Sequence, residues 1–373
     1  MKIVIPGGSG QVGTMLERAL TADGHEVVVL TRTPRGPRQV YWDGSTLGDG
    51  RRERRGPASA TGEAGPVEAG PVEADWAAEI DGSDVVINLA GHSVSCRYTE
   101  ANLAAMMNSR VDSARVVGAA IAAAERPPRV WLQMSTVTIY AHRFDAPNDE
   151  LTGVIGGDEP GVPGYWEYSI RIARNWEAEQ EKAATPHTRK VALRAAMVMS
   201  PDRGGIFDVL SGLVRCGLGG PVAGGRQYVS WIHEHDFVRA VRFLIEHEEI
   251  TGAVNLAAPE PLPQREFMRE LRSAWRMPFG LPATRVMAEI GAFALRSDTE
   301  LLLKSRRVVP GRLLDAGFVF DYPRWSGAAP ALSGKTTIVR PPTAAPSAPI
   351  AAAAPSRSTE SPTSRSSGSR PAR

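Results

Sequence analysis

Short apolar runs alternate with longer stretches of helical periodicity along most of the chain. Residues 1–5 and 26–30 (EVVVL) are short, continuous apolar runs that favour buried strands, and the glycines after residue 6 indicate a tight turn. The residues between the two runs have apolar side chains at helical spacing, namely Val12, Met15, Leu16 and Leu20. The first thirty residues therefore predict a strand, a glycine turn, a helix and a second strand.

The same alternation continues through the first half of the chain. The pattern predicts further strands at 84–89, 129–135 and 190–195, with helices at about 99–124 and 165–183. Parallel strands need crossover connections, and such crossovers are right-handed. The predicted fold class is therefore α/β: a Rossmann-like doubly wound parallel sheet with a smaller C-terminal substrate region.

Composition divides the chain into four segments. Residues 1–200 are predicted to form the Rossmann domain, interrupted at 44–74 by a disordered insertion rich in Gly, Pro, Arg and Glu that contains the pentad GPVEA twice. Residues 201–327 are predicted to form the substrate region, which can share part of the sheet. Residues 328–373 are rich in Pro, Ala, Ser and Thr, and we expect a disordered tail.

Charge and cysteine content exclude several classes of partner and site. The formal net charge is +2, from 43 basic and 41 acidic side chains, so we expect neither nucleic acid nor membrane as a partner. The basic run at 51–55 is interpreted as a solvated loop. Two cysteines and no leader-like segment favour a cytoplasmic protein. No metal is expected, because His233, His235 and Asp236 lack the spacing of a ligand set.

The glycine turn after the first strand is the strongest functional signal. Gly7, Gly10 and Gly13 form G-x-x-G-x-x-G between a predicted strand and a predicted helix, which is the context of a dinucleotide site. The first glycine permits the tight turn, the second leaves room for a pyrophosphate, and the third lets the helix approach the sheet. The remaining predicted contacts of this loop are Ser9, Gln11 and Val12. We expect the N–H groups at the helix N-terminus to face the anion.

The end of the second strand indicates which dinucleotide binds. A carboxylate there would bind the ribose hydroxyls of NAD, whereas a basic residue accommodates the 2′-phosphate of NADP. This chain has Thr31 and Arg32 at that position, with Arg35 close by and no carboxylate. The predicted cofactor is therefore NADP, held by charge-assisted hydrogen bonds.

Several motifs in order resemble those of extended short-chain dehydrogenases/reductases. They are GGSGQVG, NLAG at 88–91, MST at 134–136, NSRV at 108–111, NWE at 175–177, GGRQYVSWIHEHD at 224–236 and SRRVVPGRLLDAGFVFDYP at 305–323. Together they are most similar to the sugar-epimerase-like subgroup 39U over residues 1–325, apart from the insertion. The resemblance implies a Rossmann domain that holds NADP(H), with further cofactor contacts from Leu89, Ala90, Gly91, Arg110, Ser135 and Met197.

The resemblance also exposes a gap in the catalytic residues. Extended short-chain enzymes use a Tyr, a Lys four residues later, and a nearby Ser or Thr. Thr136 lies where that hydroxyl belongs, although a purely structural hydrogen bond is an equal alternative. Alignment on Trp176 and Glu177 puts Ser169 in place of the Tyr and Ala173 in place of the Lys. Tyr168, one position away, is the candidate proton donor if the helix register shifts; otherwise it is an ordinary packed tyrosine.

These observations leave two functional hypotheses open. The first is an NADP(H)-binding epimerase- or oxidoreductase-like enzyme that acts on an unidentified small carbonyl or nucleotide-sugar substrate. The alternative is a non-catalytic NADP(H)-binding regulator or interaction protein, which the missing Tyr and Lys favour. A homodimer formed through two long helices is a further expectation from related folds.

Overall fold

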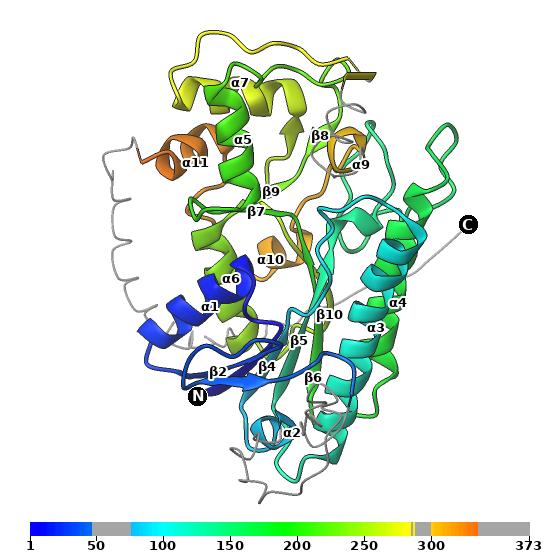
Figure 1. Ribbon diagram of the computed structural model, residues 1–373, viewed down its shortest axis with the longest axis vertical. Coiled ribbons are helices and arrows are strands. Elements are labelled where there is room, and N and C mark those ends of the chain that lie inside the picture. Colours follow the sequence, from blue (N-terminus) through cyan, green and yellow to red (C-terminus); the bar gives the residue numbers. More distant parts are fainter. Residues whose placement is uncertain (47–75, 285, 288–299, 335–373) are drawn as a thin grey trace, which may run out of the picture. The chain divides into compact units, whose positions relative to one another are not determined.

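A parallel sheet forms the centre of the chain. The computed structural model describes residues 1–46, 76–284, 286–287 and 300–334. Within them, a seven-stranded sheet has the order β10-β6-β5-β4-β1-β2-β3, and all of its strand pairs are parallel (Figure 1). Its strands are β1 (Lys2–Pro6), β2 (Glu26–Thr31), β3 (Gln39–Tyr41), β4 (Val85–Asn88), β5 (Val130–Thr136), β6 (Arg189–Ala195) and β10 (Gly252–Leu256).

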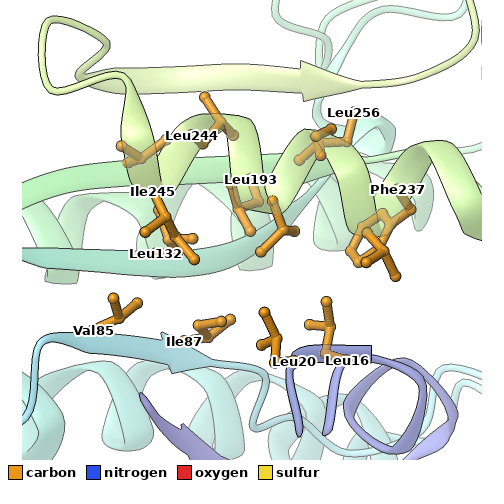
Figure 2. Close-up of a cluster of buried hydrophobic side chains, with 14 of the residues drawn as sticks. Leu16, Leu20, Val85, Ile87, Leu132, Leu193, Phe237, Leu244, Ile245 and Leu256 are labelled. Atoms are coloured by element: carbon orange, nitrogen blue, oxygen red, sulfur yellow. The ribbon is translucent and has the colours of Figure 1, made fainter. Parts of the chain in front are cut away.

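Helices cover both faces of this sheet. One hydrophobic core joins the sheet to α1 (Gln11–Ala22) and α6 (Glu234–Glu246), as Figure 2 shows. A second core joins the opposite face to α2 (Trp76–Ile80), α3 (Glu100–Ala123) and α4 (Trp166–Lys182). Figure 1 shows α3 and α4 side by side, away from α1 and α6. The predicted doubly wound Rossmann-like fold is therefore confirmed.

The apolar runs become strands because both sides of each strand are buried. Successive side chains of a strand point to opposite faces, and Val27 and Val29 of β2 belong to the core under α1, whereas Val28 and Leu30 belong to the core under α3. A strand buried on both faces needs apolar residues at every position. This explains why EVVVL is a continuous apolar run.

A smaller C-terminal region packs around a third hydrophobic core. It contains the helices α5 (Ile206–Arg215), α7 (Gln264–Ala274) and α11 (Trp325–Leu332). It also contains two short strand pairs: β7 (Met197–Met199) pairs with β9 (Trp231–His233), and β8 (Tyr228–Val229) pairs with β11 (Leu262–Pro263). At its centre, Trp325 stacks on Phe267 at 4.2 Å between ring centroids and donates its indole N–H to the Phe267 carbonyl.

The structure changes the predicted start of the tail. Strand β10 lies in the predicted substrate region, 201–327, and pairs with β6, so this region contributes a strand to the Rossmann sheet. The tail was expected to begin at 328, but α11 continues to Leu332, because Ala328, Ala329 and Leu332 are buried in the third core. Except for residues 44–46, the predicted insertion lies outside the described residues, as does the tail beyond 334.

The start of α6 fastens the C-terminal segment to the Rossmann domain. Sequence reasoning suggests that Asp236 caps this helix, but the cap is His233, whose Nδ1 accepts from the His235 N–H at 3.0 Å. Asp236 lies three residues after this cap and faces inward. Its buried carboxylate accepts from the backbone N–H groups of Asp321 and Tyr322 at 2.9 and 2.8 Å. His233 also stacks on Tyr322 at 3.8 Å between ring centroids.

Among the described residues, no helix combines the length and apolar composition needed to cross a bilayer.

The burial of His233 predicts a pH-dependent stability. Burial, together with His235, lowers the pKa of His233 to about 4 from an ordinary 6.5, so the folded protein keeps this ring neutral while the unfolded chain binds a proton. The free energy of unfolding should therefore fall as the pH drops from 6.5 to 4, and His233 alone should account for about 3 kcal/mol of that loss. Urea unfolding at several pH values measures this effect in the wild type and in His233→Asn, which retains a capping side chain. The free energy of unfolding should depend less steeply on pH in the variant. Equal slopes would contradict the assignment.

Candidate functional site

The glycine turn between β1 and α1 is shaped by close backbone contacts. Gly7 has φ +74°, and a Cβ added to it would lie 2.5 Å from Ala90 Cα. A Cβ on Gly13 would lie 2.1 Å from the Gly8 carbonyl oxygen. A Cβ on Gly10 would meet no described atom within 4 Å. Gly7 and Gly13 are thus required by packing, while Gly10 borders open space.

That open space lies at the N-terminus of α1. Gly10 is the N-cap of this helix and provides no side-chain cap, and the first turn contains no acidic residue. The first N–H groups of a helix have no partner within the helix and carry a partial positive charge. Gln11 adds a buried side-chain Nε2 that has no hydrogen-bond partner among the described groups. This arrangement fits an anionic group such as a diphosphate.

The predicted contacts at the end of β2 meet the glycine turn. The buried Thr31 hydroxyl donates to Ser9 Oγ at 3.0 Å, so these two predicted residues are brought together. Arg32 follows immediately and is exposed, as are Arg35 and Arg38. Three exposed guanidinium groups with no carboxylate in the segment 31–38 make this rim suited to an additional phosphate.

A partly buried cation lies beside the end of β4. Ala90 donates its N–H to Asn88 Oδ1 at 3.1 Å, and Leu89 packs against the first core. Arg110 of α3 lies against Gly91, whose added Cβ would be 3.0 Å from the guanidinium carbon. Burial lowers the pKa of Arg110 to about 10. None of the described carboxylates forms an ion pair with Arg110, so its charge suits an anionic ligand.

Ser135 has a structural partner rather than a free hydroxyl. It donates to Glu177 Oε1 at 2.5 Å, and Glu177 also forms a bidentate pair with Arg194 at 2.9 and 2.8 Å. Arg194 donates in addition to the Tyr140 hydroxyl at 2.9 Å. This network ties β5, α4 and β6 together beneath the site. Met197 is half-buried in β7, and Val12 packs against the first core.

The catalytic candidates lie at the carboxyl end of β5 and the start of α4. Thr136 ends β5, accepts from the Thr138 N–H and donates to Thr138 Oγ1, both at 3.1 Å. Tyr168 has Arg171 over its ring at 4.6 Å, and none of its described hydrogen bonds reaches Thr136. The next residue, Ser169, donates instead to Glu300 Oε2 at 2.5 Å. Ala173, at the expected position of the Lys, is buried.

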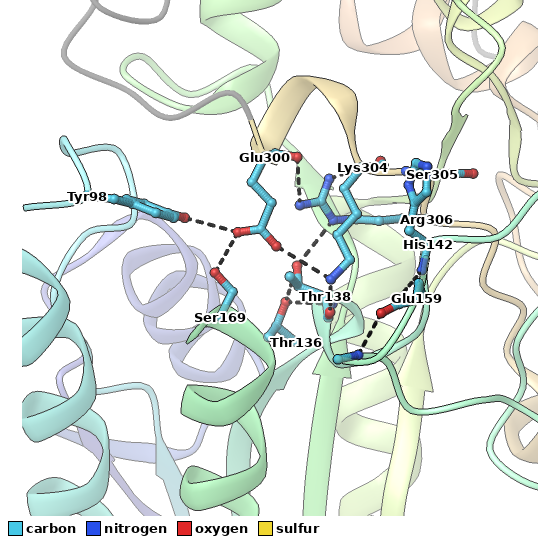
Figure 3. A network of polar contacts seen from close by, with 11 residues as sticks. Tyr98, Thr136, Thr138, His142, Glu159, Ser169, Glu300, Lys304, Ser305 and Arg306 are labelled. Carbon is cyan, nitrogen blue, oxygen red and sulfur yellow. Dashed lines mark hydrogen bonds and ion pairs between the residues drawn. The ribbon is translucent and has the colours of Figure 1, made fainter. Parts of the chain in front are cut away.

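Sequence reasoning missed a buried charged cluster supplied by the C-terminal region. Glu300 begins α9 (Glu300–Leu303), and Lys304 and Arg306 follow it. Lys304 donates to the Thr138 carbonyl at 2.9 Å, and Arg306 donates to Thr138 Oγ1 at 3.2 Å (Figure 3). Burial lowers the pKa of Lys304 to about 8. The signal available beforehand was the i, i+4 spacing of Glu300 and Lys304 in an otherwise apolar stretch.

The two histidines considered as metal ligands have other roles. His233 caps α6, and His235 Nε2 lies 2.8 Å from Asp321 Oδ2. Within the described residues, no group of three His, Cys, Asp or Glu side chains could hold a metal ion.

The strand order and the glycine turn together define a Rossmann-type dinucleotide-binding class of protein. The chain belongs to the NAD dependent epimerase/dehydratase family, whose model matches residues 3–257. A second model, described as a domain of unknown function (DUF1731), matches residues 292–332. The resemblance to the extended short-chain subgroup 39U is therefore confirmed.

Similar proteins span nearly the whole chain. Epimerase family protein SDR39U1 of Bos taurus is 29% identical over 334 residues, covering 88% of this chain and 98% of that protein. An epimerase family protein of Mycobacterium bovis is 30% identical, covering 86% and 93%. The crystal structure of human SDR39U1 (isoform 2) with NADPH superposes with a TM-score of 0.71 at 25% identity, covering 90% of this chain and 100% of that one.

The glycine contacts predict a larger loss of stability at Gly13 than at Gly10. Gly13→Ala should destabilise the fold by about 1–3 kcal/mol, because its Cβ would overlap the Gly8 carbonyl. Gly10→Ala should cost less than about 1 kcal/mol, because the space around it is open. Urea denaturation of both variants measures the difference. Equal destabilisation would show that the turn is not packed as described.

Proposed function

We propose that this chain binds NADP(H) at the glycine turn and acts as an epimerase- or oxidoreductase-like enzyme on a small carbonyl or nucleotide-sugar substrate. The observation that carries the proposal is the uncapped N-terminus of α1, which opens onto free space at Gly10 next to Arg32. The human relative with NADPH supports the choice of nucleotide, although other structures of the same fold hold NAD.

The chain's residues divide into three binding roles under this proposal. The N–H groups at the start of α1 and the Gln11 amide would hold the diphosphate. Arg32, with the Thr31 and Ser9 hydroxyls beside it, would hold the 2′-phosphate. Arg110 would bring a second positive charge to the nucleotide near Gly91. When bound, the nicotinamide accepts or supplies a hydride.

The end of β5 and the start of α4 would then receive the substrate. Ligands of open α/β sheets bind outside the carboxyl ends of the strands, and Thr136 is the last residue of β5. Its hydroxyl and that of Ser169 are half-buried and can orient a substrate oxygen.

The second candidate is a non-catalytic NADP(H)-binding regulator. It is favoured by Ser169 and Ala173, which occupy the positions where related enzymes have the Tyr and Lys. A panel of carbonyls and sugar nucleotides, assayed both at 340 nm with NADPH and for epimerised product, separates the two hypotheses. We expect NADPH consumption with at least one carbonyl or an epimerised sugar nucleotide; tight binding with neither would favour the regulator.

Cofactor preference gives the direct test of the binding site. In fluorescence titrations the wild type should bind NADPH at least about tenfold more tightly than NADH, because a charge-assisted contact to the 2′-phosphate contributes ~1.5–3 kcal/mol. Arg32→Glu should remove that preference. Lys182→Glu, the same charge change on an exposed residue at the far end of α4, should preserve it. Unchanged preference in Arg32→Glu would contradict the assignment of the phosphate site.

A further inference from the structure

Glu300 and Lys304 form an ion pair that is completely buried. The Lys304 Nζ lies 3.5 Å from Glu300 Oε1, and the two side chains are 0% and 1% exposed. Removing two charges from water costs several kcal/mol per ion, which their attraction offsets only in good geometry. Apolar side chains of similar volume would dock a segment equally well, so the presence of both charges requires a reason beyond packing.

The pair reaches the proposed substrate position through hydroxyl groups. Ser169 donates to Glu300 Oε2 at 2.5 Å, and Lys304 donates to the Thr138 carbonyl at 2.9 Å. Thr138 Oγ1 in turn accepts from Thr136. Figure 3 shows the pair above the ends of β5 and α4, with Ser169 and Thr136 below it. The Ser169 hydroxyl therefore connects Glu300 to the carboxyl edge of the sheet, whereas Thr136 is connected through Thr138 Oγ1 to Arg306.

Other contacts already hold the C-terminal segment in place. Glu150 accepts from the Asn255 and Arg312 N–H groups at 2.7 and 3.3 Å. The Ser305 N–H donates to His142 Nδ1 at 2.8 Å, and the Val308 N–H donates to Ser230 Oγ at 2.9 Å. Among the contacts of the described C-terminal residues, the hydrogen bond between Ser169 and Glu300 reaches the start of α4, at the position where the resemblance places the tyrosine.

We propose that Ser169, Glu300 and Lys304 form the proton relay of this site, in place of the missing Tyr and Lys. The inference rests on the proposed function, since it requires a nicotinamide nucleotide and a substrate oxygen. Ser169 would touch the substrate, whereas Glu300 and Lys304 act through Ser169 and position its proton.

The relay balances protons and electrons in both directions. During oxidation, a substrate hydroxyl passes its proton to Ser169 Oγ as Ser169 passes its own to the Glu300 carboxylate, and the hydride leaves the same carbon for the oxidised nicotinamide. The products are a carbonyl, the reduced nicotinamide and a neutral carboxyl group. Lys304, with a pKa of about 8, can take that proton when it is neutral. Reduction reverses each transfer.

The surroundings of Lys304 set its response to a nearby charge. Glu300 and Glu159 raise its pKa, while burial and Arg306 lower it. Among the described residues, two further titratable side chains lie near the pair: His142, after β5, and Tyr98, before α3. A cation placed beside the relay should therefore lower the pKa of Lys304 further.

The two redox forms of the nucleotide supply that cation without a substrate. The ring of NADP⁺ is positively charged and that of NADPH is neutral, while the 2′-phosphate is common to both. If the pKa of Lys304 falls by one unit, binding of NADP⁺ at pH 8 releases about 0.4 proton more than binding of NADPH. Isothermal titration calorimetry in HEPES and in Tris, which differ in ionisation enthalpy, measures the number of protons released.

Three variants of the full chain distinguish a proton-transfer role of Lys304 from a role in holding the C-terminal segment in place. Lys304→Met and Lys304→Arg should both abolish the proton difference, and the arginine retains the charge that a docking role needs. Glu150→Gln, which weakens docking elsewhere, should show the wild-type difference. A difference that persists without Lys304, or that is absent from the wild type, would overturn the relay while leaving the nucleotide site intact. Failure of both nucleotides to bind the wild type would overturn the proposed function and the relay with it.

Discussion

Close packing of the backbone at the first βα junction determines where this protein can bind a ligand. Gly7 lies against Ala90, and Gly13 lies against Gly8, at separations that no side chain would permit. These contacts bring the start of α1 onto the ends of β1 and β4, so the uncapped helix N-terminus opens at the carboxyl edge of the sheet. The other features of the candidate nucleotide site lie around this point.

The second constraint is the burial of charge where the C-terminal segment meets the Rossmann domain. Asp236 holds the backbone of 321–322, and Glu300 and Lys304 lie over the end of β5. Asp236 is more than sixty residues from 321–322 in sequence, and Glu300 and Lys304 are likewise more than sixty residues from their partners Ser169 and Thr138. The C-terminal region therefore contributes polar groups to the carboxyl edge of the sheet as well as covering it.

The fold could be predicted from sequence because its signals are local. Strands β1, β2, β4 and β5 are largely apolar runs, α1 has a periodic apolar face, and the glycine turn lies between β1 and α1. The short strand β3 (QVY) carries no such signal. The nucleotide contacts predicted from the same region stay a prediction; the structure brings Ser9 and Thr31 together and leaves Arg32, the next residue, exposed.

The polar cluster could not be predicted, because its contacts are long-range. Ser169 and Glu300 are 131 residues apart, and nothing in either segment indicates the other. Asp236 was expected to cap α6 because it stands near the start of the helix, but the helix begins two residues earlier and turns the carboxylate inward. The end of α11 was missed because small alanines, which resemble a low-complexity tail in composition, pack well against a tryptophan core.

A crystal structure of the protein grown with NADPH would locate the nucleotide relative to the glycine turn. We expect electron density for a diphosphate at the N-terminus of α1 beside Gly10, and for a phosphate within hydrogen-bond distance of Arg32. Density for the nucleotide elsewhere, or an adenosine phosphate directed away from Arg32, would show that the glycine turn is not the nucleotide site.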